Sequence, residues 1–418
     1  MGKRLTGDYF LKHQKVACCD YILTTNIEME LQSGFTLGSW EEGYGDLEII
    51  IDPSTVKTLA WMSATAIIIG DLYQKDGRQV AVSPRAILKK QYDHALTMGF
   101  HPMMASELEF YMFENSYEDA ASSGGAALTP SSTHAIDYHI LETEWQEDVI
   151  RKIRNQISAS GIPTESSKGE VGKGQYEIAL EYGDAVESAD RHVIYKLGAK
   201  SIAAKEHRAI TFMAKYSDAD AGSSCHIHTS LIASETGKNV FWNDEAKEGS
   251  EQFRYFLGGL HALTSDLFLF FAPNVNSYKR YCSNSFAPTH VSWGYDNRST
   301  SFRVVGEGQS FRIENRMPGA DANPYLAYSA IIAAGMYGIE NKIDCPPSFN
   351  GNVYDSEQLS ILPTSLEEAA ANLERSSIAH SIFGDDVIKH YVRHARLEAE
   401  AYSKTVGTWE VKRYFERN

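Results

Sequence analysis

The stretch Ser106–Phe113 reads SELEFYMF and places two glutamates among apolar residues in a segment with the pattern of a β-strand. Successive side chains of a strand point to opposite faces, so Glu107 and Glu109 share one face while Leu108 and Phe110 share the other. An apolar face of this kind packs into a core, and the opposite face is left for solvent or for a bound group. The stretch therefore predicts a sheet strand that presents a pair of carboxylates.

Three further segments repeat this pattern with other polar side chains. The residues expected to share one face are Gln175 and Glu177 in 175–180, His226 and His228 in 225–231, and Arg312, Glu314 and Arg316 in 310–317, with Glu170 ahead of the first pair. Any one pair alone is more typical of a solvated outer sheet face. Together, the four strands would gather five carboxylates, two imidazoles and two guanidinium groups on one surface. Like charges so close repel one another unless cations lie between them.

The types of donor indicate the cation and the chemistry. Carboxylate oxygens with one imidazole per ion suit Mg²⁺ or Mn²⁺, and the lack of thiolates argues against structural zinc. Arginines beside such ions are what phosphoryl transfer needs, because they stabilise charge on the transferred phosphate. The glycines around Lys173 do not have the spacing of a P-loop, so a P-loop enzyme is not expected. Spacing alone predicts metal-dependent phosphoryl transfer.

The remainder of the chain predicts an α+β protein of two domains, 1–82 and 83–418. The first domain is expected to be β-rich, because Leu47–Ile51 and Thr65–Leu72 are apolar, β-branched runs bounded by turn residues. Pro84 is expected to open the second domain and its first helix. The predicted helices are Arg85–Met98, Glu142–Ala159, Asp184–Arg208, Ala322–Lys342 and an exposed, charged Asp385–Thr405.

Composition excludes several classes of function. The chain has 418 residues, 43% of them hydrophobic, and a formal net charge of −16. Such a charge disfavours binding to nucleic acid or to an anionic membrane surface. No apolar run approaches the ~20 residues that span a bilayer, and the N-terminus lacks the pattern of a secretory signal. Five cysteines without CxxC spacing indicate reduced thiols and a cytoplasmic protein.

Eight segments, in this order, resemble glutamine synthetases, especially the bacterial type I branch and its glutamine-synthetase-like relatives. They read SELEFYMF, EVGKGQYEI, HRAITFMAK, GSSCHIHTSL, NSYKR, NRSTSFR, RIENR and ADANPYLA, and the resemblance spans roughly residues 46–418. It implies a small, apparently shortened β-grasp N-terminal domain and a catalytic domain whose curved antiparallel sheet is flanked by helices. It also implies active sites shared between neighbouring subunits of a homo-oligomer, usually a dodecamer of two hexameric rings.

The resemblance also implies roles for individual residues. Matches to metal ligands are Glu109, Glu170 and Glu177 on the glutamate side and Glu107, His226 and Glu314 on the nucleotide side, giving two to three Mg²⁺ or Mn²⁺ ions per site. Matches to ATP contacts are His228, Ser230 and Arg312. Matches to glutamate contacts are Gly222, Arg280 and Arg316, and matches to the arginines that stabilise the transferred phosphate are Arg298 and Arg303. The reaction implied joins the γ-carboxyl of L-glutamate to an amine through γ-glutamyl phosphate, with ATP as co-substrate.

Departures from the family pattern concern the second substrate. Ammonia-using type I enzymes carry a glutamate six residues after the NSYKR arginine, where this chain has Phe286, and an N-terminal aspartate where Thr36 is expected. The asparagine before the glutamate-loop glycine is replaced by Ala221. Phe286 therefore predicts an organic amine as substrate.

Two alternatives stay open. An ammonia-using glutamine synthetase would need other carboxylates, and Glu41, Glu42, Asp46 or Glu307 are available for that role. A non-catalytic relative is disfavoured by the full set of buried charges, because unused buried charges destabilise a fold. Tyr354 lies where some type I enzymes are adenylylated, but its flanking sequence differs, so an ordinary loop tyrosine is expected.

Overall fold

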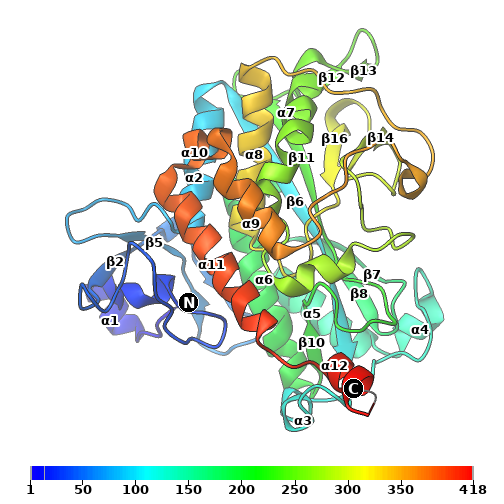
Figure 1. The fold of residues 1–418 in the computed structure, drawn as a ribbon. Coiled ribbons are helices and arrows are strands. Elements are labelled where there is room, and N and C mark those ends of the chain that lie inside the picture. The colour runs from blue at the N-terminus through cyan, green and yellow to red at the C-terminus, as the bar shows by residue number, and fades with distance from the viewer. Residues whose placement is uncertain (1, 14, 417–418) are drawn as a thin grey trace.

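The computed structural model describes residues 2–13 and 15–416. Figure 1 shows a small N-terminal sheet at one side of the molecule and a larger sheet covered by helices. The predicted fold class, a small N-terminal β unit followed by a helix-flanked sheet, is confirmed. The division of the chain at residues 82 and 83 stays a prediction.

The N-terminal unit is a three-stranded antiparallel sheet in the order β1–β2–β5. Its elements are α1 (Gly7–Lys12), β1 (Lys15–Cys19), β2 (Asp46–Ile51), β5 (Gly70–Tyr73) and a ribbon of β3 (Lys57–Thr58) with β4 (Ala66–Ile67). The expected strand at Leu47–Ile51 is β2, whereas the expected strand at Thr65–Leu72 is divided between β4 and β5. β5 begins at Gly70, where a Cβ would lie 2.6 Å from Ile49 Cγ2, so glycine permits the close approach to β2.

The larger sheet has nine strands in the order β14–β15–β16–β11–β6–β8–β7, with β9 and β10 also pairing with β6. All its pairs are antiparallel except β14 with β15, which are parallel. The strands are β6 (Phe100–Phe113), β7 (Thr164–Gly169), β8 (Gln175–Leu180), β9 (Gly183–Asp184), β10 (Ala209–Thr211), β11 (Cys225–Ala233), β14 (Trp293–Tyr295), β15 (Phe302–Val305) and β16 (Arg312–Asn315). β12 (Trp242–Asn243) and β13 (Glu248–Gly249) form a separate ribbon.

Strand β6 shows how the core positions the polar face. Leu108, Phe110 and Met112 are buried, and the strand contacts helices α2 (Pro84–Thr97) and α6 (Ala185–Lys205). Because side chains alternate, this packing leaves Glu107 and Glu109 on the face away from those helices. The shared face predicted for Glu107 and Glu109 is confirmed, because a carboxylate oxygen of each lies within 4.8 Å of one of Glu177.

The predicted helices are found with two corrections. Three of them, α2, α6 and α8 (Pro324–Glu340), match within a few residues. The predicted helix Glu142–Ala159 is two helices, α4 (Ile140–Glu144) and α5 (Glu147–Ala159), which separate where Gln146 Nε2 donates a hydrogen bond to Ser131 O at 2.9 Å. The other helices are α3 (Tyr117–Ser122), α7 (Glu251–Leu267), α9 (Leu366–Arg375), α10 (Ser377–Phe383), α11 (Asp385–Ser403) and α12 (Thr408–Tyr414).

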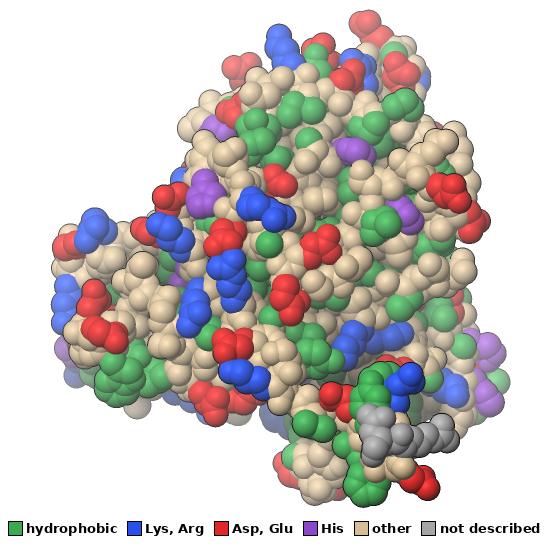
Figure 2. All heavy atoms as spheres, in the orientation of Figure 1, with side chains coloured by type: hydrophobic (Ala, Val, Ile, Leu, Met, Phe, Trp, Pro, Cys, Tyr) green, Lys and Arg blue, Asp and Glu red, His purple; other side chains and the backbone are tan. Residues whose placement is uncertain are grey.

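Helix α11 was predicted to be exposed, and this is wrong for one of its faces. Val387, Ile388, Val392, Ala395 and Ala399 are buried and lie along one face of the helix. Figure 1 shows α11 lying across the helices and strands behind it. Its charged residues occupy the outward face, where acidic and basic side chains are interspersed (Figure 2). Among the described residues, no helix is long and apolar enough to cross a membrane.

A buried ion cluster joins the N-terminal sheet to the helices. Arg85, at the start of α2, makes a bidentate pair with Asp190 of α6 through Nε and Nη2, at 3.0 and 2.9 Å. Its Nη1 donates to Asp71 of β5 at 2.8 Å, and Nη2 also donates to Asp52 after β2 at 2.9 Å. Lys89 pairs with Asp71 at 2.7 Å. One guanidinium group thus holds three carboxylates from three segments.

Candidate active site

The register of the larger sheet brings the predicted polar residues together on neighbouring strands. Glu109 of β6 lies directly opposite Glu177 of β8, and Glu107 lies opposite His226 of β11. On the other side of β11, His228 lies opposite Glu314 of β16. These four strands are adjacent in the sheet, so the polar pairs form one continuous surface, as expected.

One group of carboxylates contains Glu109, Glu170 and Glu177, whose oxygens lie within 4.8 Å of one another. Burial raises the pKa of Glu170 to about 8, and the charge of Glu109 adds to the effect. Burial, together with the neighbouring glutamates, raises the pKa of Glu177 well above its ordinary value. Three carboxylates so placed need a counter-charge to ionise together. This donor set fits a hard divalent cation such as Mg²⁺ or Mn²⁺.

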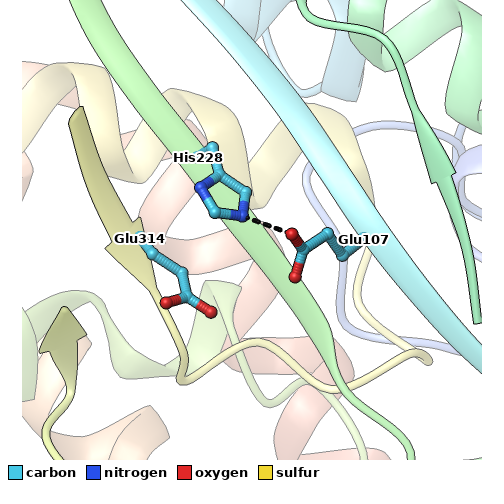
Figure 3. Close-up of side chains that lie close together, drawn as sticks. All are labelled: Glu107, His228 and Glu314. Carbon is cyan, nitrogen blue, oxygen red and sulfur yellow. Dashed lines mark hydrogen bonds and ion pairs between the residues drawn. The ribbon is translucent and has the colours of Figure 1, made fainter. Parts of the chain in front are cut away.

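A second group is centred on Glu107 (Figure 3). His228 Nε2 lies 2.8 Å from Glu107 Oε1, and Glu314 completes a set whose ligand atoms lie within 4.8 Å. His226 Nδ1 also lies 3.5 Å from Glu107 and 3.3 Å from Glu314. The predicted set of Glu107, His226 and Glu314 is therefore brought together, and His228 joins it.

The electrostatics of this second group differ from those of the first. Burial opposes ionisation of Glu107, but hydrogen bonds with His226 and His228 outweigh it and lower the pKa of Glu107 well below its ordinary value. Burial likewise opposes ionisation of Glu314, but Arg316 and the two histidines lower its pKa to about 2. Both carboxylates are therefore anionic at neutral pH and can act as oxygen ligands.

The predicted arginines line the surface beyond Glu314. Arg316 Nη1 donates to Glu314 Oε1 at 2.6 Å, and Arg303 Nη1 donates to Glu314 Oε2 at 2.9 Å. Arg280 is buried and donates to the carbonyl oxygens of Arg316 and Met317 at 3.0 and 2.8 Å. Arg298, by contrast, is half-exposed, and its nearest acidic partner is Asp296 at 3.9 Å.

The remaining predicted residues lie at the two ends of this surface. Arg312 Nε donates to His228 Nδ1 at 3.1 Å, and Ser230 follows on the same face of β11. Gly222 lies against Arg280, where a Cβ would come within 2.5 Å of Arg280 Cγ, so a larger residue would displace that arginine. Phe286 is 57% exposed, and its backbone carbonyl oxygen accepts a hydrogen bond from Arg316 Nη2 at 3.5 Å.

The structure adds residues to which the sequence pattern assigned no role. Ser224 donates to Glu109 through its backbone N–H at 2.8 Å and through its hydroxyl at 2.6 Å. Gln175 Nε2 donates to Glu109 at 3.0 Å and to Gly222 O at 3.0 Å. The shared strand face of Gln175 and Glu177 was a signal in the sequence for Gln175, whereas no periodic pattern marked Ser224. Both orient a carboxylate of the first group.

Two charged residues also pair with predicted site residues. Lys168 of β7 lies 2.6 Å from Glu170 and 2.9 Å from Asp137. Asp296 accepts from Arg303 Nε at 2.9 Å and holds that guanidinium group from the side opposite Glu314. In sequence these residues look like ordinary surface charges, and only the packing reveals their partners.

This arrangement suits phosphoryl transfer. It combines two carboxylate groups able to hold divalent cations with arginines able to contact anionic oxygens. The buried Arg316 pairs with Glu314, and the buried Arg280 bonds to the carbonyl oxygen of Arg316, so both could hold a carboxylate substrate beside the second group. The chemistry predicted from strand spacing is therefore compatible with the assembled geometry.

Comparisons with known proteins agree with this chemistry. A sequence model described as "Glutamine synthetase, catalytic domain" matches residues 81–414. The chain is 42% identical to gamma-glutamylethanolamide synthetase GlnA4 of Streptomyces coelicolor, over 100% of this chain and 90% of that protein. It is 34% identical to a glutamate–isopropylamine ligase of a Pseudomonas species, over 99% and 92%. The solved structure of a GmaS/ADP complex matches with a TM-score of 0.81 and 28% identity, over 89% of this chain and 86% of GmaS. The chain belongs to the glutamine synthetase family.

Proposed function

We propose that this protein is an ATP-dependent glutamate–amine ligase that joins the γ-carboxyl of L-glutamate to an organic amine through γ-glutamyl phosphate. The observation that carries the proposal is Phe286, an apolar ring beside the substrate arginines at the position where ammonia-using relatives carry a glutamate. The two relatives named above, a γ-glutamylethanolamide synthetase and a glutamate–isopropylamine ligase, support an organic amine as the second substrate.

The two carboxylate groups are proposed to hold two to three Mg²⁺ or Mn²⁺ ions. Glu109, Glu170 and Glu177 would bind on the glutamate side, and Glu107, His226 and Glu314 on the nucleotide side. Ions bound there would neutralise the carboxylates and screen the repulsion between the γ-carboxylate of glutamate and the phosphates of ATP. Ser224 and Gln175 would keep Glu109 oriented, because their hydrogen bonds occupy both of its oxygens.

The arginines are proposed to bind the carboxylates of glutamate and the transferred phosphoryl group. Arg280 and Arg316 would hold the carboxylates of glutamate, with Gly222 contributing a backbone contact. Arg298 and Arg303 would contact the transferred phosphoryl group and stabilise its charge. His228, Ser230 and Arg312 would contact ATP. Activation by phosphorylation is needed because a free carboxylate is a poor acyl donor, whereas an acyl phosphate carries a good leaving group.

Phe286 is proposed to select the amine. Ammonia is almost wholly NH₄⁺ at neutral pH, so a site that uses it needs anionic groups to concentrate the ion and take its proton. The carbon substituent of an organic amine can instead bury against the ring, at ~25 cal/mol per Å². Burying one or two methylenes corresponds to about a 10-fold preference.

Replacing Phe286 tests this proposal. We expect at least one alkyl-, hydroxyalkyl- or arylamine to show a kcat/KM at least ~10-fold above that of ammonia. Phe286→Glu should shift this ratio towards ammonia, because it removes the apolar surface and adds an anion. The measurement is glutamate-dependent phosphate release with each amine below saturation. The matched control is Ile361→Glu, which adds a charge at another exposed apolar residue and should leave the ratio unchanged. If ammonia equals or exceeds every amine in a broad panel, the protein is a glutamine synthetase and this role of Phe286 is wrong.

Assembly into a dodecamer of two hexameric rings also stays a proposal. Trp40 lies in the loop 34–46 and is 72% exposed, and this loop would complete the active site of a neighbouring subunit. We expect light scattering to show a species many times the mass of one 46.6 kDa chain, and activity to follow that species on dilution. A fully active monomer would contradict the shared site.

A further inference from the structure

The segment that carries Phe286 has a strained backbone. This segment, residues 282–288, is called the flap below, and it reads CSNSFAP. Asn284 and Phe286 have φ angles of 60° and 59°, in the left-handed region that side chains other than glycine adopt only at a cost. A conformation of this kind persists when its surroundings hold it in place.

Among the described residues, backbone carbonyl oxygens of the flap accept hydrogen bonds from two side chains elsewhere in the fold. One, from Arg316 Nη2 to Phe286 O, is long at 3.5 Å. The other, from the hydroxyl of Tyr354 to Ala287 O, is 2.8 Å. The ring of Phe286 is mostly exposed and adds little burial of its own. The tyrosine therefore makes the stronger of these two attachments.

Tyr354 is itself anchored next to a proposed catalytic arginine. It lies in the short 3-10 helix Val353–Asp355, within the coil that follows α8 and runs past β14 (Figure 1). Val353 N–H donates to Ser299 Oγ at 3.2 Å, and Asn297 Nδ2 donates to Gly351 O at 2.9 Å. Asn297 and Ser299 flank Arg298. The coil thus connects the Arg298 loop to the flap through one phenol.

The surroundings keep this phenol protonated as a donor. Tyr354 is half-buried, and burial raises its pKa, although Arg316 and Arg280 act in the opposite direction. The same two arginines are the proposed glutamate contacts, so the phenol lies at the border between the glutamate site and the flap.

We propose that Tyr354 is a positioning residue that holds the flap beside Arg316, so that Phe286 keeps a fixed position that sets the affinity for the amine and the flap keeps water from γ-glutamyl phosphate. This inference rests on the proposed function. With the bond removed, Phe286 loses its fixed position, and water gains access to the acyl phosphate. A water oxygen then attacks the acyl carbon, the bond to the phosphate oxygen breaks, and glutamate and phosphate leave while a proton passes to solvent. Phosphate is released without amide.

The test is Tyr354→Phe, which keeps the ring and removes only the hydroxyl. We expect the KM for the amine to rise about 3- to 10-fold, the range that corresponds to one lost hydrogen bond. The KM for ATP should change less than ~2-fold, because the nucleotide contacts lie elsewhere. The amount of amide formed per phosphate released should fall below that of the wild type.

Tyr391→Phe is the matched control. The hydroxyl of Tyr391, on α11, donates to Val82 O at 2.8 Å, a bond of the same type and length that does not involve the flap. This variant should keep the wild-type KM values and the wild-type ratio of amide to phosphate. Thermal unfolding of both variants shows whether the two lost bonds affect stability equally.

The outcomes separate the two proposals. If Tyr354→Phe keeps the amine KM and the ratio of amide to phosphate, the tyrosine has only a structural role and the inference is wrong, even when kcat falls. If the wild-type protein forms no glutamyl amide with any amine, the proposed function itself fails. If the wild type forms a glutamyl amide and Tyr354→Phe forms less amide per phosphate released, both proposals are supported.

Discussion

Glu109→Gln is expected to lower glutamate-dependent phosphate release at least about 100-fold while the protein remains folded. Loss of a group that only orients a metal ligand already costs 10- to 100-fold, and Glu109 is a proposed ligand itself. Glutamine has nearly the same volume as glutamate and can keep hydrogen bonds to Ser224 and Gln175. The change therefore removes charge with little effect on packing.

A second readout of this variant does not depend on turnover. Mg²⁺ or Mn²⁺ that binds only the folded protein should raise the thermal unfolding temperature of the wild type, and should do so less for Glu109→Gln. Glu165→Gln is the control, because Glu165 is an exposed glutamate of β7 outside both carboxylate groups.

EDTA should abolish wild-type activity, and Mg²⁺ or Mn²⁺, not Zn²⁺, should restore it. A fully active Glu109→Gln, or activity that survives chelation, would refute the metal assignment.

Arg85→Met is expected to lower the free energy of unfolding by about 3–5 kcal/mol, the range measured when one partner of a buried ion pair is removed. Arg85, Asp71 and Asp190 are each less than a tenth exposed. Without the guanidinium group, three carboxylates are left with Lys89 as the remaining cation of the cluster. Methionine fills most of the volume, so the loss is mainly electrostatic.

The control for this variant is Arg78→Met. Arg78 pairs with Asp76 at 2.7 Å, but both side chains are more than half exposed. Exposed pairs of this kind contribute about 0–1 kcal/mol. In urea-induced unfolding followed by circular dichroism, the midpoint urea concentration of Arg85→Met should be well below that of the wild type and that of Arg78→Met. Equal midpoints for the two variants would show that the Arg85 cluster contributes no more than a surface pair.

The faces of the site strands could be predicted from the sequence because they depend on local geometry. Side chains of a strand alternate wherever the strand lies, so Glu107 and Glu109 had to share a face. Helix α2 was predictable for a similar reason, since its apolar spacing after Pro84 is a local signal, and α8 was predictable from its composition, which is rich in Ala, Tyr and Ile. The predictions that failed were those where a distant contact overrides the local pattern. Gln146 bonds to Ser131 between α4 and α5, and the buried face of α11 depends on what packs beneath it.

The sequence by itself therefore determined which charged residues form the site and which of them share a strand face. Through the family resemblance, it also indicated which chemistry they serve. The tertiary structure decided the partners. Pairing of β6 with β8 and β11 sets Glu109 against Glu177 and Glu107 against His226. Packing of the coil after α8 brings Tyr354 to the flap. A strand's alternation is imposed by its own backbone, whereas the neighbour that a side chain meets depends on the free energy of packing the whole chain.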